Sequence, residues 1–133
     1  MNYWLVKSEP FTFSWEKFVK EGKASWDGVR SYPGRKNLRA MKKDDLVLFY
    51  HSMEGKEVVG IAKVIGEAYQ DPTTDEDWSA VDLAPVQQLK KSVSLESIRA
   101  EKKLQNIYLI KQGRLSVMPL EKIEFDLIVK MGS

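Results

Sequence analysis

Apolar residues along this chain form short runs and short helical periods, with no long hydrophobic stretch. A continuous run such as Leu46–Tyr50 is typical of a strand buried on both faces, and alternation over Ala80–Val86 predicts a strand with one buried face. Gly60 and Gly66 mark expected bulges or close approaches. The predicted strands are Tyr3–Val6, Leu46–Tyr50, Glu57–Glu67, Ala80–Val86 with a polar extension through Ser92, and Leu115–Met118, which Pro119 is expected to stop.

Helices are predicted where apolar residues recur at helical spacing after a capping residue. Ser14 is expected to cap a short helix that packs Trp15 and Phe18 inward, with Gly22 just beyond its last turn. The predicted helical segments are Ser14–Glu21, Arg35–Met41 after a turn at Tyr32-Pro33-Gly34, a helix starting at Ser94, and Leu120–Met131, while Ile107–Ile110 fits either a helix or a strand.

The order of these elements predicts the fold class. Short strands are interrupted by short helices without a regular strand–helix alternation, which favours an α+β fold built on a small β-barrel of mostly antiparallel strands flanked by short helices. The 133 residues are enough to bury a core in one domain, residues 1–133. We see no internal repeat, linker or low-complexity segment.

The amino-acid composition limits the kinds of binding site that this chain can form. The chain is 43% apolar and 30% charged, which argues against disorder. Because it has no cysteine and one histidine, thiolate metal sites, disulfides and a histidine-cluster metal site are excluded, and no cofactor is expected. No apolar run approaches a membrane span, and the N-terminus lacks a signal-peptide pattern. We therefore expect no membrane partner and a cytoplasmic location, or a nuclear one in a eukaryote.

The charges are unevenly distributed. A net charge of +2 is too small to predict nucleic-acid binding by itself. However, six bases and no acid lie between Gly28 and Lys43, whereas five acids and no base lie between Asp71 and Asp82. This pattern predicts a polarised protein with a basic end and an acidic end.

The basic end coincides with an unusual segment, Ala24–Met41. It combines aromatic rings, guanidinium groups and a carboxamide, the groups that hold a flat, polar, anion-linked ligand such as a nucleotide base. The segment is also too polar and too often broken by glycine and proline to be expected in the core. We therefore predict that its aromatic side chains line a binding site.

The chain resembles the EVE domain, a member of the PUA-like superfamily. The resemblance rests on motifs that span nearly the whole chain. They are YWLVKSEP at Tyr3–Pro10, WDGVR at Trp26–Arg30, NLR at Asn37–Arg39, DLVLFYHS at Asp45–Ser52, VVGIAKV at Val58–Val64, YQDPT at Tyr69–Thr73 and GRLSVMPL at Gly113–Leu120. The family often carries Asn-Tyr-Gln-Ala-Arg-Asn after WDGVR, and this chain departs from that pattern at Pro33-Gly34 and Lys36.

The resemblance implies a binding module for nucleic acid, DNA or RNA, that carries a modified base, with methylated or oxidised cytosine in DNA as the leading ligand. EVE domains are related in fold to YTH domains, which read a methylated adenine through an aromatic cage. Trp26 is expected to stack on the base and the arginines to contact phosphates. The expected ligand-binding residues are Lys7, Ser8, Trp26, Arg30, Tyr32, Asn37, Tyr50, His51, Ser52, Trp78, Arg114 and Ser116, and the expected phosphate-binding residues are Arg35, Lys36 and Arg39.

Other interpretations of these residues stay open. Trp26 could instead be a core residue, and Trp78 could pack as a lid over the core. Asn37 could brace its loop through backbone hydrogen bonds. The basic residues Arg30, Arg35, Lys36 and Arg39 could form a solubilising face. The competing functions are an RNA binder, a protein-interaction domain, and an enzyme of nucleotide modification that uses His51 with Asp27 or Glu9. No nucleophile elbow, phosphate-binding glycine loop, zinc motif or dinucleotide fingerprint is present, so we expect a binding protein rather than an enzyme.

Overall fold

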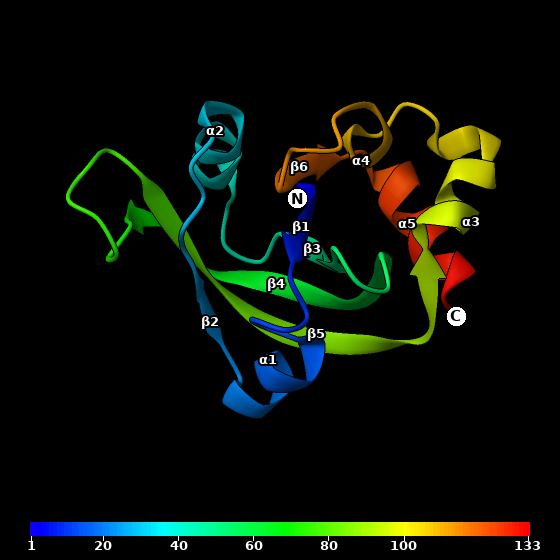
Figure 1. The fold of residues 1–133 in the computed structure, drawn as a ribbon, viewed down its shortest axis with the longest axis horizontal. Helices are drawn as coiled ribbons and strands as arrows, with labels where there is room; N and C mark the ends of the chain where they lie inside the picture. The colour runs from blue at the N-terminus through cyan, green and yellow to red at the C-terminus, as the bar shows by residue number, and fades with distance from the viewer.

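The computed structural model describes residues 1–133 as six strands and five short α-helices, with one additional 3-10 turn (Figure 1). The strands are β1 (Tyr3–Ser8), β2 (Ala24–Trp26), β3 (Leu46–His51), β4 (Glu57–Gln70), β5 (Ser79–Ser94) and β6 (Val117–Leu120). The helices are α1 (Trp15–Glu21), α2 (Tyr32–Ala40), α3 (Leu95–Ala100), the 3-10 turn η1 (Lys102–Leu104), α4 (Tyr108–Lys111) and α5 (Lys122–Met131). The predicted α+β class is confirmed. None of the helices has both the length and the apolar character that crossing a membrane requires.

All six strands form one sheet in the order β2-β5-β4-β3-β1-β6. Only β1 and β3 pair in parallel, and every other pair is antiparallel. The long strands β4 and β5 shift register at several points, and Figure 1 shows them bending together along their length. The sheet does not close, because β2 and β6 are its two edges. The expected small barrel is therefore an open, curved sheet.

Helix α2 connects the two sides of this open sheet. Asn37 donates from Nδ2 to the carbonyl of Val117 in β6 at 2.7 Å. Two residues later, the Nε of Arg39 donates to Ser79 Oγ in β5 at 2.9 Å. Strand β6 is one edge of the sheet, and β5 lies next to β2, the other edge. Helix α2 therefore bridges the two sides of the sheet whose edges would pair with each other in a closed barrel.

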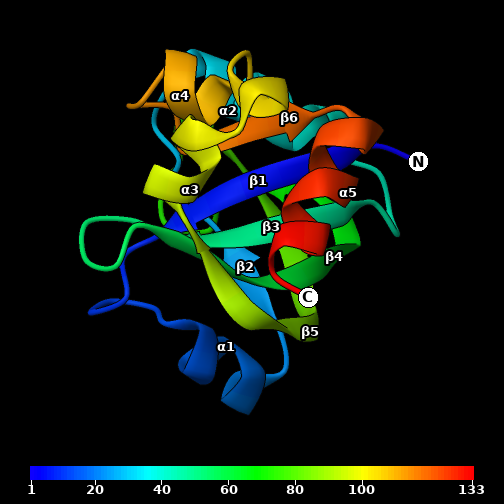
Figure 2. The same cartoon turned by 90° about the vertical axis from the view of Figure 1, so that its right-hand side faces the viewer.

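Alternation along the central strands builds two cores on the two faces of the sheet. Leu48 and Tyr50 of β3 point to one face, whereas Val47 and Phe49 point to the other. Helices α1 and α2 cover the first core, and α3, α4 and α5 cover the second, with α3 and α5 in front of β1 and β3 in Figure 2. The helix residues of the first core are Trp15, Phe18 and Leu38, and those of the second are Ile98, Leu109, Phe125 and Ile128.

Two local predictions are wrong. Tyr32-Pro33-Gly34 is the first turn of α2 rather than a separate turn, because Ser31 caps the helix by accepting from the N–H of Gly34 at 3.1 Å. Proline fits there because the first helical turn leaves N–H groups without helical acceptors anyway. Pro119 lies inside β6 instead of stopping it, since β6 is an edge strand and tolerates a missing donor.

Other local predictions are confirmed. Ser14 caps α1 by accepting from the N–H of Lys17 at 3.1 Å, and Gly22 follows the last turn. Gly60 permits the expected close approach, because a Cβ built there would lie 2.4 Å from the Trp15 ring. Ile107–Ile110, left open above, becomes the N-cap and first residues of α4.

Candidate functional site

A cleft of about 600 Å³ lies where the sheet stays open, between edge strand β2 and the carboxyl end of β1. Its wall is formed by residues 7–9, 12–13 and 24–30 together with Ser116, which precedes β6. The cleft therefore collects side chains from three distant parts of the sequence. Five of the expected ligand-binding residues meet in it: Lys7, Ser8, Trp26, Arg30 and Ser116.

Trp26 belongs both to the first core and to the cleft wall. Only 8% of the residue is exposed, and its ring packs edge-on against Phe49, at 5.6 Å between centroids, and against Phe13, at 6.2 Å. Its indole nitrogen makes no hydrogen bond within the chain yet keeps contact with solvent, unlike the sealed Nε1 of Trp15. The expectation that the first part of this segment stays out of the core is wrong, since Trp26 and Val29 are core residues.

The polar groups of the cleft are balanced in charge. Lys7 and Arg30 carry positive charge, whereas Glu9 and Asp27 carry negative charge. Ser8 and Ser116 add hydroxyl groups, although the Ser8 hydroxyl already donates to the carbonyl of Phe13. A wall of this kind offers both hydrogen-bond donors and acceptors to a polar ring. The Asp27 carboxylate is available as an acceptor, because it forms no ion pair within the chain.

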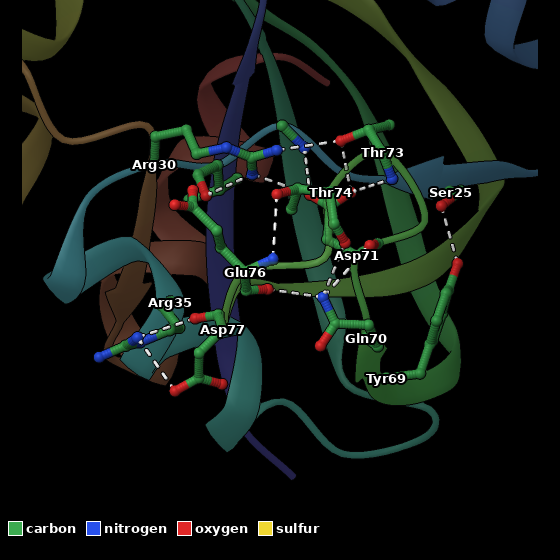
Figure 3. Close-up of polar contacts among 12 residues, drawn as sticks. Ser25, Arg30, Arg35, Tyr69, Gln70, Asp71, Thr73, Thr74, Glu76 and Asp77 are labelled. Carbon is green, nitrogen blue, oxygen red and sulfur yellow. Dashed lines mark hydrogen bonds and ion pairs between the residues drawn. The ribbon is translucent and has the colours of Figure 1, made fainter.

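A buried carboxylate fixes one side of the cleft. Asp71, whose side chain is fully buried, accepts from Gly28 N at 2.8 Å, Arg30 Nη1 at 2.9 Å and the N–H and hydroxyl of Thr73 at 2.7 and 2.6 Å (Figure 3). Burial alone raises the pKa of Asp71, but these hydrogen bonds outweigh it and hold the pKa well below its usual range. Gly28 adopts a φ of +76°, which favours glycine at this turn.

A second polar chain braces β2 on its outer side. The Tyr69 hydroxyl donates to Asp82 at 2.6 Å. It also lies 2.7 Å from Ser25 Oγ (Figure 3). Because the single tyrosine proton goes to the carboxylate, Ser25 is the donor of the second bond. Burial, followed by the hydrogen bond to Asp82, raises the pKa of Tyr69. These bonds tie the edge strand to β4 and β5.

The acidic and basic segments lie against each other, so the expected separation into a basic and an acidic end is wrong. Asp77 pairs with Arg39 at 2.6 Å and with Arg35 at 3.4 Å. The Arg35 guanidinium also lies 4.9 Å from the Tyr32 ring and 5.2 Å from the Trp78 ring. The two rings stack at 5.7 Å between centroids, and Tyr32 remains 70% exposed. Two of the three expected phosphate-binding residues thus already hold a carboxylate, whereas Lys36 is exposed and forms no ion pair.

The structure places several expected ligand-binding residues outside the cleft. Asn37 braces α2 against β6, as described above. Tyr50 and Ser52 line a different hollow, and Arg114 is exposed and does not line the cleft. Tyr32 and Trp78 form their stack next to Arg30, whose guanidinium lies 5.7 Å from the Trp78 ring, so they adjoin the cleft without lining it.

His51 is engaged in holding helix α1. Its Nε2 accepts from the N–H of Trp15 at 3.1 Å, which requires the unprotonated ring nitrogen. Burial lowers the pKa of His51, and the nearby Glu57 partly opposes that shift. The enzyme hypothesis requires His51 beside Asp27 or Glu9, but those two acids line the cleft and His51 does not. The acid–base set which that hypothesis needs is not assembled.

Sequence reasoning missed Phe13, Thr12 and Asp71. Phe13 and Thr12 line the cleft, and Asp71 holds its wall from behind. The motif YQDPT contained a signal for Asp71, because aspartate followed by proline and threonine is a typical turn that recruits the carboxylate. Its partners in the cleft wall, Gly28 and Arg30, are however 43 and 41 residues away, and no local pattern connects them to Asp71.

An open α+β sheet with a mixed aromatic and polar cleft between its edges defines a small ligand-binding domain. The chain belongs to the EVE domain family, whose model matches residues 2–131, and the resemblance seen in the sequence is confirmed. Mouse thymocyte nuclear protein 1 is 36% identical over 165 aligned residues, which cover 98% of this chain and 73% of that protein.

Solved structures share the fold. A protein from Agrobacterium tumefaciens is 42% identical with a TM-score of 0.98, covering 100% of this chain and 94% of that one. The human THYN1 protein, crystallised in complex with DNA containing 5-methylcytosine, is 31% identical with a TM-score of 0.93. The match covers 100% of this chain and 98% of the human chain. A YTH domain from Zygosaccharomyces rouxii, in complex with N6-methyladenosine RNA, is 15% identical with a TM-score of 0.63 over 99% and 86%, which shows a likeness of fold.

Proposed function

We propose that this protein is a nucleic-acid-binding module that takes a modified base, methylated or oxidised cytosine in DNA, into the cleft beside Trp26. The observation that carries the proposal is the cleft itself, which is open to solvent and joins a partly accessible indole to unpaired polar groups. The human relative supports it, because that protein was crystallised with DNA containing 5-methylcytosine and matches this chain along its whole length.

The chemistry of the wall suits cytosine. The exocyclic amine of cytosine is a donor, and a carboxylate such as that of Asp27 is a suitable acceptor for it. The indole N–H of Trp26 is free to donate to a carbonyl or ring nitrogen of the base. Arg30 is held by Asp71 and lines the cleft with a side chain that is 40% exposed. It would contact the sugar–phosphate backbone of the bound nucleic acid.

The energetic balance requires contacts with the base itself. Taking a base out of a duplex costs a few kcal/mol, and an aromatic contact returns about 1–3 kcal/mol. Because Trp26 exposes only a small part of its surface, the polar contacts and Phe13 have to supply the remainder. A modification that weakens stacking or adds apolar surface shifts this balance toward the bound state.

A panel of DNA and RNA oligonucleotides, each carrying one modified base, tests the proposal. We expect the wild-type protein to bind 5-methylcytosine DNA more tightly than the same plain DNA. Trp26→Ala is a poor test, because removing a core indole costs about 3–5 kcal/mol of folding free energy. Trp26→Phe keeps most of the core packing and removes the N–H.

The matched control is Trp15→Phe, the same substitution in the same core but outside the cleft. We expect Trp26→Phe to reduce the ratio of modified to plain affinity several-fold and Trp15→Phe to preserve it. Equal ratios in the two variants, with both shown to be folded by circular dichroism, would contradict the proposed role of the cleft.

A further inference from the structure

A second, smaller hollow lies on the other side of β1 from the cleft. It measures about 230 Å³ and is lined by Lys7 and Tyr50 at the ends of β1 and β3, Lys56 in the β3–β4 hairpin and Arg99 in α3. Leu95 and Leu109 give it an apolar side. Lys7 lines both hollows, so the two sites are neighbours at the carboxyl end of β1.

Tyr50 carries an unused donor into this hollow. The residue is 3% exposed, yet its hydroxyl makes no hydrogen bond within the chain and is not sealed from solvent. Burial raises the pKa of Tyr50, and Arg99 acts in the opposite direction, so the hydroxyl keeps its proton at neutral pH. Because this hydroxyl reaches solvent and has no partner within the chain, it is free to donate to an acceptor on a ligand.

The cations around the hollow are not neutralised by the protein. Lys7, Lys56 and Arg99 form no ion pair, and none of the lining residues is acidic. Lys7 donates to the carbonyl of Gly113 at 2.6 Å, which orients its ammonium and leaves two further protons to donate. Lys56 adopts a left-handed φ of 46°, and its carbonyl accepts from the N–H of Leu95, which ties the hairpin to α3.

We infer that this hollow binds a phosphate group of the nucleic acid whose base enters the cleft. Three cations and a hydroxyl donor suit a tetrahedral oxyanion, and the apolar side formed by Leu95 and Leu109 suits a sugar. The inference rests on the proposed function, since the shared Lys7 links the two hollows. It also reassigns Tyr50 from contact with the base to contact with the backbone.

The same chemistry would hold free phosphate, so the test has two arms. The first measures the affinity of Lys56→Gln/Arg99→Gln and of Tyr50→Phe for plain and for 5-methylcytosine oligonucleotides over a range of salt concentrations. The second follows the backbone amide resonances of Lys56 and Arg99 by NMR while inorganic phosphate is added. The matched control is Lys103→Gln/Lys130→Gln, which removes the same charge from exposed positions away from both hollows.

We expect the double variant to weaken binding of both oligonucleotides by about tenfold, as loss of charged hydrogen bonds does. The slope of log affinity against log salt should fall by about one, the signature of one lost phosphate contact. Tyr50→Phe should produce a smaller loss of the same kind, and the ratio of modified to plain affinity should stay at its wild-type value in both variants.

The inference is overturned if the double variant behaves like its control, or if phosphate shifts the two resonances while oligonucleotide binding is unaffected by the substitutions. The second result would assign the hollow to free phosphate. Failure of the proposed function looks different. In that case Trp26→Phe leaves the modified-to-plain ratio unchanged, while the double variant still flattens the salt dependence.

Discussion

The Arg30 guanidinium and the Asp71 carboxylate meet at 2.9 Å across 41 residues of sequence, with the aspartate side chain fully buried. The same Asp71 oxygen accepts from Gly28 N, so one carboxylate orients both the turn after β2 and the side chain at the cleft rim. The cleft wall therefore depends on a residue that does not line it. Binding and stability are expected to be coupled at this point.

Asp71→Asn should destabilise the fold. The amide replaces a carboxylate that accepts four hydrogen bonds, and breaking a buried ion pair costs about 3–5 kcal/mol. Urea unfolding followed by fluorescence measures the loss. Asp75→Asn is the control, because Asp75 lies in the same loop, is exposed and forms no ion pair. Equal midpoints for the two variants would show that Asp71 does not anchor the cleft.

The stability of the protein should fall as the pH drops below 6.5. Burial lowers the pKa of His51 from its ordinary value of 6.5, so the folded protein takes up the proton at a lower pH than the unfolded chain. The stability contributed by unprotonated His51 is therefore fully present above pH 6.5 and is lost as the pH falls below it. The expected loss is about 1 kcal/mol, for the hydrogen bond to Trp15. The unfolding midpoint at pH 7.5 and 5.5 measures this decline. His51→Gln, which keeps an acceptor without titrating, should lose less.

Asp77→Asn should strengthen binding to every oligonucleotide. The Asp77 side chain is 77% exposed and pairs with Arg35 and Arg39, so it would compete with phosphates if these arginines bind them, as proposed from the sequence. Releasing both arginines should raise affinity by about three- to tenfold at low salt and steepen the salt dependence. Asp75→Asn makes the same change in net charge nearby and should have a smaller effect. If the two variants bind equally, the basic face of α2 does not contact phosphates.

Gly60→Ala should destabilise the protein by overpacking. The added Cβ would lie 2.4 Å from the Trp15 ring, which is fixed in the first core. Inserting a carbon into a packed core costs about 1–3 kcal/mol. Thermal unfolding compares it with Gly113→Ala, where nothing lies within 4 Å of the added carbon. A similar shift in both variants would contradict the close packing of Trp15 on β4.

Elements with strong local signals could be predicted from the sequence. The run Leu46–Tyr50 is β3 with one added residue, and the cap at Ser14 begins α1, because apolar periodicity and capping act within a few residues. That the sheet stays open could not be predicted in this way. It depends on how α2 bridges β5 and β6, through Asn37 and Arg39, and such contacts leave no local pattern.

Some residues of the candidate cleft were expected from the sequence. Trp26, Arg30 and Lys7 were expected at the site and lie in the cleft wall. The charge pattern was misleading, since basic and acidic runs far apart in sequence come together in the fold through Asp77. Strand alternation predicts that Tyr50 points to the opposite face of the sheet from Phe49. That its hydroxyl lacks a hydrogen-bond partner depends on tertiary packing and could not be predicted from the sequence.

The most direct test of the cleft is the indole N–H resonance of Trp26 during titration with an oligonucleotide that contains 5-methylcytosine. The chain has four tryptophans, and the indole N–H of Trp4 is bonded to Asp45 at 3.0 Å while that of Trp15 is sealed in the core. We predict that the Trp26 resonance moves on binding and that those of Trp4 and Trp15 stay in place. A Trp26 resonance that remains unchanged at saturation would contradict the account.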